Sequence, residues 1–171
     1  AIIKKVKQNP KVEQIFAAPG NGGIAADATC VAIDAKNIEA IAEFAVKEKI
    51  DYAIVAPDDP LALGLVDKLE EKGVRAFGPR ANAAIIEASK AFSKSLMKKY
   101  NIPTAKYETF DNKDDALKYL ETQPMPIVIK ADGLALGKGV IIAQTLEDAK
   151  AAVVSMMEDK AFGSAGHTVV I

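Results

Sequence analysis

The apolar positions in the first half of the chain alternate between two spacings. Residues 13–18 (EQIFAA) and 51–56 (DYAIVA) are short, mostly apolar segments, which are typical of buried strands. Residues 37–49 instead repeat apolar side chains with the spacing of one helix face. Those side chains are Ile38, Ile41, Ala42, Ala45 and Val46. The pattern predicts a strand, a helix and a second strand in this order.

Capping and turn residues mark the next elements. Asp59 is a good N-cap with Pro60 at the first helical position, and Gly73 follows the last apolar position of that helix. A short strand over residues 75–77 and a helix over residues 79–88 come next. Strands and helices that alternate with short connections favour a parallel sheet with helices on both faces, as in doubly wound nucleotide-binding folds.

The pattern changes after Ala88. A basic helix over residues 90–100 ends at Asn101-Ile102-Pro103, and a strand over residues 106–110 follows it. Asn112 then caps another helix. Here helices and strands no longer alternate as regularly as they do in the first half.

Two further strands are predicted to form a hairpin. They cover residues 126–131 and 140–143, and a glycine-bearing turn joins them. Thr145 opens a helix in which Asp148 completes a capping box, and a last apolar strand begins near Thr168. The second half is therefore predicted to be α+β with antiparallel pairing.

The two halves predict two domains, residues 1–88 and residues 89–171, with the boundary near Ala88. The chain starts without Met, in what reads as the second half of a helix over residues 1–8, and it stops within an apparent strand over residues 168–171. We therefore expect both ends to be incomplete and the first domain to lack its first strand.

Charge and composition argue against several classes of protein. Lys and Arg number 22 against 23 Asp and Glu, so no overall field favours nucleic acid or a membrane surface. No apolar run approaches the roughly 20 residues that span a bilayer. The single cysteine, Cys30, excludes an internal disulfide framework and suits a reducing compartment. We expect a cytoplasmic protein that binds neither nucleic acid nor membrane.

Residues 127–140 (IVIKADGLALGKGV) carry the strongest chemical signal. Lys130 ends a buried strand, so a rigid element holds its ammonium, and Lys138 adds a second cation in the turn. Glycines in the turn let backbone N–H groups approach a polyphosphate without interference from a Cβ atom. They are Gly133, Gly137 and Gly139. Phosphoryl transfer requires mainly positioning and charge neutralisation, which lysines and backbone donors supply.

This segment matches neither of two common phosphate-binding loops. Three residues separate Gly133 from Gly137, where a Walker A loop has four, and the Rossmann GxGxxG pattern is absent. A hairpin turn in which glycines serve the geometry and lysines serve solubility remains the alternative.

Two longer segments resemble the ATP-grasp superfamily, and within it the phosphoribosylamine–glycine ligases. They are SKAFSKSLMKKYNIPTA (residues 89–105) and PIVIKADGLALGKGV (residues 126–140). Further segments are similar to motifs of that family and occur in the family's order. These are APGNGGIA, IVAPDDPLALGLVD, FGP and AFGSAGHTVVI.

The resemblance implies roles for individual residues. Lys90 and Lys130 would face the phosphates of ATP and, with Lys138, would stabilise the transferring phosphoryl group. The ATP-binding turn would also include backbone groups from the segment that follows Lys130, namely Gly133, Leu134, Gly137 and Gly139. Taken alone, Lys90 is better interpreted as a solvated helix lysine.

The resemblance also places four residues of the first domain at a substrate cleft. They are Gly20, Asn21, Asp58 and Pro60. Asp58 departs from the family, which usually has Glu there, and an Asp is one methylene shorter. By itself it also reads as a loop carboxylate near a helix N-terminus, where negative charge is favourable.

The function implied by the resemblance is the ATP-dependent ligation of glycine to 5-phosphoribosylamine through glycyl phosphate, in de novo purine biosynthesis. Mg²⁺ or Mn²⁺ would assist, with carboxylate ligands outside this chain, so that this chain alone would be inactive. The alternatives are another ATP-grasp carboxylate–amine ligase, a biotin-carboxylase-like subunit, and a module that binds nucleotide without turnover.

Overall fold

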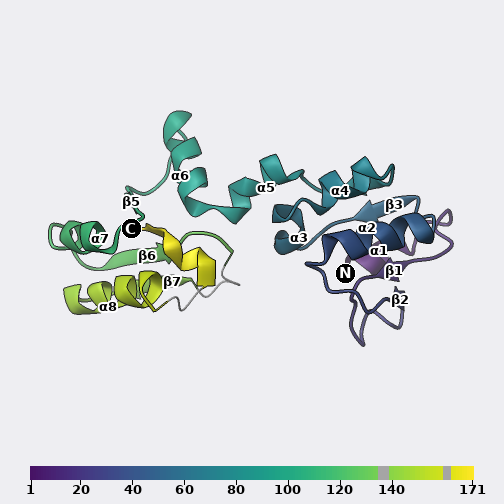
Figure 1. Cartoon of the computed structure of the whole chain (residues 1–171), viewed down its shortest axis with the longest axis horizontal. Coiled ribbons are helices and arrows are strands. Elements are labelled where there is room, and N and C mark those ends of the chain that lie inside the picture. Colours follow the sequence, from purple (N-terminus) through teal and green to yellow (C-terminus); the bar gives the residue numbers. More distant parts are fainter. Residues whose placement is uncertain (135–138, 160–162) are drawn as a thin grey trace. The chain divides into compact units, whose positions relative to one another are not determined.

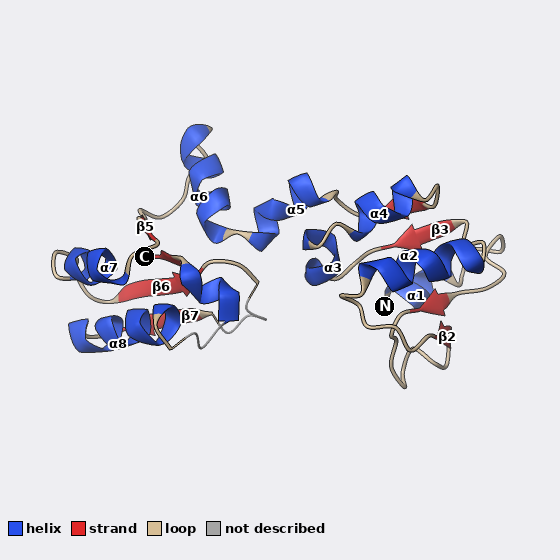
Figure 2. Cartoon of the chain, viewed as in Figure 1, coloured by secondary structure: helices blue, strands red, loops and turns tan. Residues whose placement is uncertain are grey.

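The fold is described from a computed structural model, which describes residues 1–134, 139–159 and 163–171. The chain divides into two compact units, Ala1–Ala81 and Asn82–Ile171. Each unit is described by itself. Figure 1 labels the helices and strands, and Figure 2 colours them by type.

The first unit is built on short parallel strands. Strand β1 (Phe16–Ala17) pairs with β2 (Thr29–Cys30), and β3 (Tyr52–Ile54) pairs with β4 (Arg75–Phe77). Both pairs are parallel, as the alternating pattern predicts, and each forms a separate two-stranded sheet. Strand β2 was not predicted. Its two residues are both exposed, so no apolar run marks it.

Helices of the first unit bury its core. Helix α1 covers Ile2–Val6 and helix α2 covers Ile38–Lys47, whose Asn37 cap accepts a hydrogen bond from the Ala40 N–H at 3.1 Å. Helix α2 packs on α4 (Leu65–Glu71), and α4 contacts β4. The buried residues of this core are Ala42, Ala45, Val55, Leu65, Val66, Leu69 and Val74.

The helix predicted to begin at Asp59 is instead two helices. Helix α3 covers Asp58–Ala62, and Gly64, at φ 86°, separates it from α4. The N-cap of α3 is Pro57, so Asp59 lies in its first turn and the prediction of Asp59 as N-cap was wrong. Apolar periodicity alone does not reveal this break, because the apolar positions continue across it.

The second unit contains two helices before its sheet. Helix α5 covers Ala81–Ala88, beginning at the last residue of the first unit, and α6 covers Lys90–Lys99 with Ser89 as N-cap. Helix α6 stands apart from the helices that follow it (Figure 1). The bounds of α6 confirm the basic helix predicted over residues 90–100.

An antiparallel sheet of four strands forms the body of the second unit. Its order is β5 (Thr109–Phe110), β8 (Val169–Val170), β6 (Ile127–Ala131) and β7 (Val140–Ala143). The predicted hairpin of β6 and β7 is confirmed, with Lys130 opposite Val140. Strand β6 is central because β8 pairs with its other edge.

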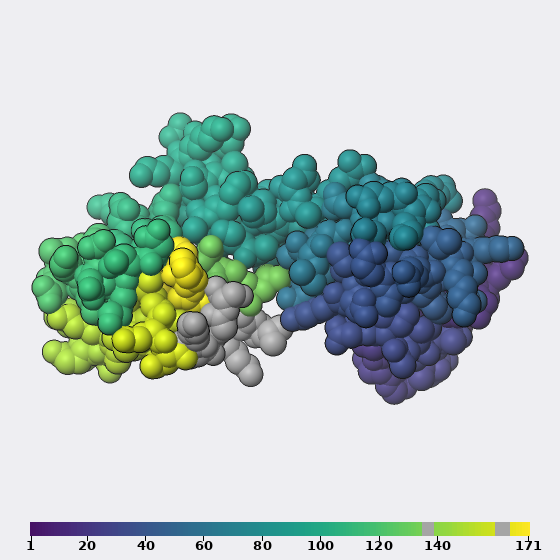
Figure 3. All heavy atoms as spheres, viewed as in Figure 1, coloured from purple at the N-terminus to yellow at the C-terminus, as the bar shows by residue number. Residues whose placement is uncertain are grey.

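Two helices cover one face of this sheet. Helix α7 (Lys113–Leu120) packs on α8 (Leu146–Met157), and α8 contacts both β6 and β7. The atoms of α7 and α8 lie against one another on the surface in Figure 3. The core between helices and sheet includes Ala116, Leu120, Ile129, Val153 and Met156, each fully buried. A short 3₁₀ helix, η1 (Gly163–His167), precedes β8 and was not predicted.

The predicted caps of α7 and α8 are present. Asn112 accepts hydrogen bonds from the N–H groups of Asp114 and Asp115 at 2.9 and 3.2 Å. Thr145 Oγ1 accepts from the Asp148 N–H at 3.1 Å and donates to Asp148 Oδ2 at 2.8 Å. The Asp148 carboxylate thus accepts a hydrogen bond from the Thr145 hydroxyl. In a full capping box it would accept from the backbone N–H of Thr145.

Candidate functional site

Strand alternation decides where the Lys130 side chain points. Successive side chains of a strand lie on opposite faces of the sheet. In β6, Ile129 and Ala131 are fully buried against the helices, while Val128 is 36 % exposed and Lys130 is partly exposed. Lys130 therefore projects from the face of the sheet that α7 and α8 do not cover.

This second face is half covered and half open. Val170 lies opposite Lys130 on β8 and is only 2 % exposed, and α6 packs near this strand. On the other side of Lys130, Val140 and Ile142 of β7 are 43 % and 63 % exposed. The Lys130 cation thus lies between a covered region at β8 and an open apolar strip formed by Val128, Val140 and Ile142.

The backbone holds Lys130 firmly in this position. Its Cα lies opposite Val140 on one neighbouring strand and opposite Val170 on the other. The next residue, Ala131, donates its N–H to the Gly139 carbonyl at 2.8 Å. Because the backbone of this central strand is already fixed on both sides, ligand binding to Lys130 has to order only its side chain.

Lys94 is a second cation of this region, and sequence analysis missed it as a site residue. It projects from α6, donating to Thr104 Oγ1 at 2.7 Å and to the Ala105 carbonyl at 3.0 Å. Its ammonium also lies 5.3 Å from the centre of the Tyr107 ring. Burial, and then the positive charge of Lys130, lower the pKa of Lys94 below its ordinary value. The second lysine of SKAFSK, within the segment that resembles the ATP-grasp superfamily, was the available signal.

Lys90 lies at the start of α6 and reaches the beginning of the turn after β6. Its Nζ donates to the Gly133 carbonyl at 2.8 Å. An ammonium has three donors, so this bond leaves others for an anionic ligand. The structure thus brings Lys90 to the residue that follows Asp132 at the end of β6, as expected if both lysines serve one ligand.

Gly133 requires the conformational freedom of glycine. Its φ is 89°, and a Cβ at this position would lie 3.3 Å from Ala165 Cβ. Leu134 is partly buried, and Gly139 is buried with its carbonyl already bonded to Ala131. The predicted roles of Gly137 and Lys138 fall on residues outside the described part of the chain.

The four predicted substrate residues lie in two segments of the first unit, the loop after β1 and the short helix α3. Gly20 and Asn21 follow β1, and Asn21 Oδ1 accepts from the Ile24 N–H at 3.0 Å. Asp58 is exposed in the first turn of α3, whereas Pro60 is buried. Asp59 is paired with Lys36 at 3.2 Å. A buried Pro60 ring packs α3 against the unit and does not present a surface to a ligand.

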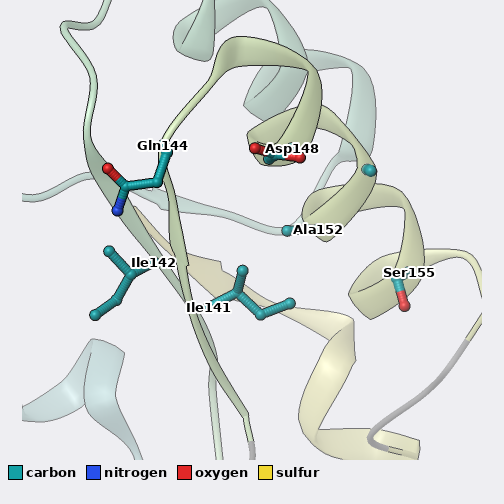
Figure 4. Close-up of a pocket in the computed structure, with 7 residues that line it drawn as sticks. Ile141, Ile142, Gln144, Asp148, Ala152 and Ser155 are labelled. Carbon is teal, nitrogen blue, oxygen red and sulfur yellow. The ribbon is translucent and has the colours of Figure 1, made fainter.

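A pocket of about 400 Å³ lies elsewhere in the second unit (Figure 4). Strand β7 supplies Ile141 and Ile142, the adjoining Gln144 follows the strand, and α8 supplies Asp148 and Ser155. Its lining contains no lysine and no predicted site residue. It shares only Ile142 with the apolar strip beside Lys130, and none of the lysines lines it.

Neither a metal-ligand cluster nor a membrane-spanning helix is found within residues 1–134, 139–159 and 163–171. Over these residues, no group of three or more His, Cys, Asp or Glu side chains could hold a metal ion. Within the same part of the chain, no helix has the length and apolar character needed to cross a bilayer.

Two family models together match the whole chain. The model described as phosphoribosylglycinamide synthetase, N domain, matches residues 1–87. The model described as phosphoribosylglycinamide synthetase, ATP-grasp (A) domain, matches residues 88–171. The chain belongs to the phosphoribosylglycinamide synthetase family. The resemblance drawn from the sequence motifs is thereby confirmed.

Relatives within the phosphoribosylglycinamide synthetase family are longer than this chain. Phosphoribosylamine–glycine ligase of Escherichia coli O157:H7 is 51 % identical over 173 residues, which cover 100 % of this chain and 40 % of that protein. The Pseudomonas putida enzyme of the same name is also 51 % identical with the same coverage. The chain therefore spans about 40 % of the length of these relatives.

Solved structures agree with the assignment to the phosphoribosylglycinamide synthetase family. The crystal structure of phosphoribosylamine–glycine ligase from Thermotoga maritima has a TM-score of 0.72 at 27 % identity, covering 92 % of this chain and 37 % of that one. The biotin carboxylase domain of a Hydrogenobacter thermophilus 2-oxoglutarate carboxylase has the same TM-score at 20 % identity, with 92 % and 38 % covered. The second likeness shows a shared fold.

Proposed function

We propose that this chain is part of an enzyme that joins glycine to 5-phosphoribosylamine at the expense of ATP. The observation that carries the proposal is the ordered match of both family models, together with the lysines of α6 and β6. Lys130 projects from the open sheet face, and burial together with the charge of Lys130 lowers the pKa of the nearby Lys94. Lys90 donates to the Gly133 carbonyl. Such a group of cations suits the phosphates of a nucleotide.

The proposed reaction has two steps. A carboxylate oxygen of glycine attacks the γ-phosphorus of ATP, giving glycyl phosphate and ADP. The amine of phosphoribosylamine then attacks the acyl carbon, and phosphate leaves as glycinamide ribonucleotide forms. Neither step needs a side-chain nucleophile from the protein.

Each lysine would act on the first step by charge and position. Lys130 and Lys90 would bind phosphate oxygens and stabilise the negative charge that moves to ADP as the bond to the γ-phosphorus breaks. Lys138 would assist from the turn that joins β6 and β7. The exposed apolar strip beside Lys130 would be available to the uncharged part of the nucleotide.

The first unit would bind the phosphoribosylamine substrate through Gly20, Asn21 and Asp58. Pro60 would act indirectly, by fixing the helix α3 that carries Asp58. We also propose that the first domain ends near Ala88 and that the protein works in the cytoplasm.

The ATP-grasp assignment implies a divalent cation, Mg²⁺ or Mn²⁺. The described residues do not provide a fitting set of carboxylates for it. We therefore assign no step to the metal and propose that its ligands lie outside these residues, so that the 171 residues alone would not turn over substrate.

ADP release by the full-length protein tests the proposed function. A coupled assay would be run with ATP–Mg²⁺ plus glycine and phosphoribosylamine, and again with each substrate omitted. We expect ADP to form only when both are present with ATP. Equal ADP release with another carboxylate or amine would favour a different ATP-grasp ligase, and ATP binding without any ADP would favour a non-catalytic module.

A further inference from the structure

Asp132 joins the start of α6 to the end of β6. Its Oδ1 and Oδ2 accept hydrogen bonds from Ser89 Oγ at 3.2 and 3.0 Å, and its Oδ1 also accepts from the Ala91 N–H at 3.0 Å. Its own N–H donates to the Thr168 carbonyl at 2.8 Å. One residue thus connects a helix, the sheet and the segment that leads into β8.

The contacts around Asp132 supply hydrogen-bond acceptors for the first N–H groups of α6. The first N–H groups of a helix have no partner within the helix. In α6, Ser89 Oγ accepts from the Phe92 N–H at 3.0 Å, and the Asp132 carboxylate accepts from Ala91. The carboxylate also lies where the positive end of the helix dipole favours negative charge.

Lys90 is the residue between these two anchored positions. Ser89 and Ala91 are both bonded to Asp132, and Lys90 itself reaches Gly133, the residue after Asp132. Asp132 and Gly133 therefore bond to three consecutive residues at the start of α6, from Ser89 to Ala91. This arrangement leaves the Lys90 backbone little freedom to shift relative to the end of β6.

We infer that Asp132 is a positioning residue for Lys90: it fixes the first turn of α6 so that the Lys90 ammonium lies at the start of the turn after β6. The inference rests on the proposed function, in which Lys90 binds nucleotide phosphate. A long lysine side chain loses considerable entropy when it is ordered by a ligand. An anchored backbone and a bond to Gly133 reduce this loss before ATP arrives.

A purely structural role for Asp132 makes a different prediction. Asn112 caps α7 of the same unit in a comparable way, through hydrogen bonds from Asp114 and Asp115. If Asp132 acts only as a cap, its loss should resemble the loss of Asn112. If it positions Lys90, its loss should weaken ATP binding only while Lys90 is present.

A double-mutant cycle in the full-length protein separates these roles. The variants are Asp132→Ala, Lys90→Ala and their combination, with Asn112→Ala as the control cap. ATP affinity would be measured by calorimetry without the other substrates, and thermal unfolding would be recorded in parallel. Because ATP binding needs no turnover, this readout does not depend on the complete reaction.

We expect Asp132→Ala to weaken ATP binding about tenfold, the equivalent of one charge-assisted hydrogen bond. In the Lys90→Ala background the same change should cost less than about twofold, because the two residues act through one interaction. Asp132→Asn keeps an acceptor for the Ala91 N–H and should restore most of the affinity. Asn112→Ala should lower the unfolding temperature but change ATP affinity less than about twofold.

Equal losses of affinity with and without Lys90 would overturn the inference, as would a lowered unfolding temperature with unchanged affinity. If Asp132→Ala does not fold, Ser89→Ala, which removes the hydroxyl that donates to Asp132, allows the same comparison with Lys90→Ala. Full-length protein that binds ATP with the expected coupling but forms no glycine-dependent ADP would refute the proposed ligase activity and leave the positioning role intact. Full-length protein that does not bind ATP would refute both.

Discussion

Lys94 on α6 lies close enough to Lys130 on β6 for the charge of Lys130 to lower the pKa of Lys94. Burial is the larger cause of this shift. The two cations come from different elements and from positions far apart in the chain. Keeping them near one another costs free energy that a bound anion would return.

The pKa of Lys94 should respond to Lys130. Replacing Lys130 by Met removes a neighbouring positive charge, so we expect the pKa of Lys94 to rise toward its ordinary value. A lysine side-chain NMR titration of the full-length protein would measure it. Lys118→Met on the exposed side of α7 is the matched control and should leave the Lys94 titration unchanged. No change with Lys130→Met would mean that burial alone sets the shift.

The same shift predicts how stability depends on pH. A lysine with a lowered pKa in the folded state holds its proton less tightly there than in the unfolded chain. The contribution of Lys94 to stability should therefore increase as pH rises from its lowered folded-state pKa toward the unfolded value, 10.5. Denaturant unfolding of the full-length protein across this window, with and without Lys94→Met, would isolate the contribution. A Lys94→Met difference that does not vary with pH would contradict it.

Lys94 should also stabilise the segment after α6. Lys94→Met removes hydrogen bonds to Thr104 and Ala105 and the contact with the Tyr107 ring. We expect a loss of about 1 kcal/mol in the free energy of unfolding, since the side chain remains partly solvated. Lys98→Met, an exposed position of the same helix, should change stability by less than about 0.5 kcal/mol. Similar values for both variants would show that the Lys94 contacts contribute nothing.

Lys130 should matter for the reaction of ATP. Removing a cation that touches the phosphates should cost about 2–4 kcal/mol of transition-state stabilisation. Lys130→Ala in the full-length protein should therefore lower kcat/KM for ATP by roughly 30- to 1000-fold. Lys118→Ala removes an exposed lysine of α7 and is the matched control, which should leave kcat/KM for ATP unchanged. An unchanged kcat/KM would return Lys130 to the role of a surface lysine at a strand end.

Gly133 should not tolerate alanine. The change combines a positive φ with a Cβ placed 3.3 Å from Ala165, and we expect a destabilisation of about 1–2 kcal/mol. Gly73→Ala has a similar φ of 79° but open space around it, so it measures the backbone cost alone. Gly22→Ala has neither feature and should be nearly neutral. Chemical denaturation of the three variants checks the order, and a Gly133→Ala as stable as Gly22→Ala would contradict it.

The sequence predicted those elements whose signals are local. Asn112 and Thr145 are polar caps just before apolar helical spacing, and the structure places both as N-caps. Strands β4 and β7 have the predicted bounds, with Gly73 ending the helix before β4 and Gly139 directly before β7. Local capping chemistry and apolar runs act over a few residues, so they can be read directly from the chain.

Other features depended on contacts that a sequence does not show. Strand β2 consists of Thr29 and Cys30, and it exists because its backbone pairs with β1. Helices α3 and α4 separate at Gly64, within a continuous apolar pattern. The link from Lys90 to Gly133 joins positions more than forty residues apart. The family resemblance proposed Lys90 and Lys130 as partners of one ligand, but it did not reveal Lys94 or Asp132.

The half-covered face of the second sheet has a further consequence for electrostatics. Lys130 lies beside buried Val170 on one side and the exposed Val140 and Ile142 on the other. Apolar protein polarises poorly, so the field of a charge at such a boundary extends mainly into the solvent. An anion approaching this unit is therefore attracted across β7 and β6, whereas α6 blocks the approach over β8. In the proposed function, the covering of the sheet would set the direction from which a polyphosphate reaches Lys130.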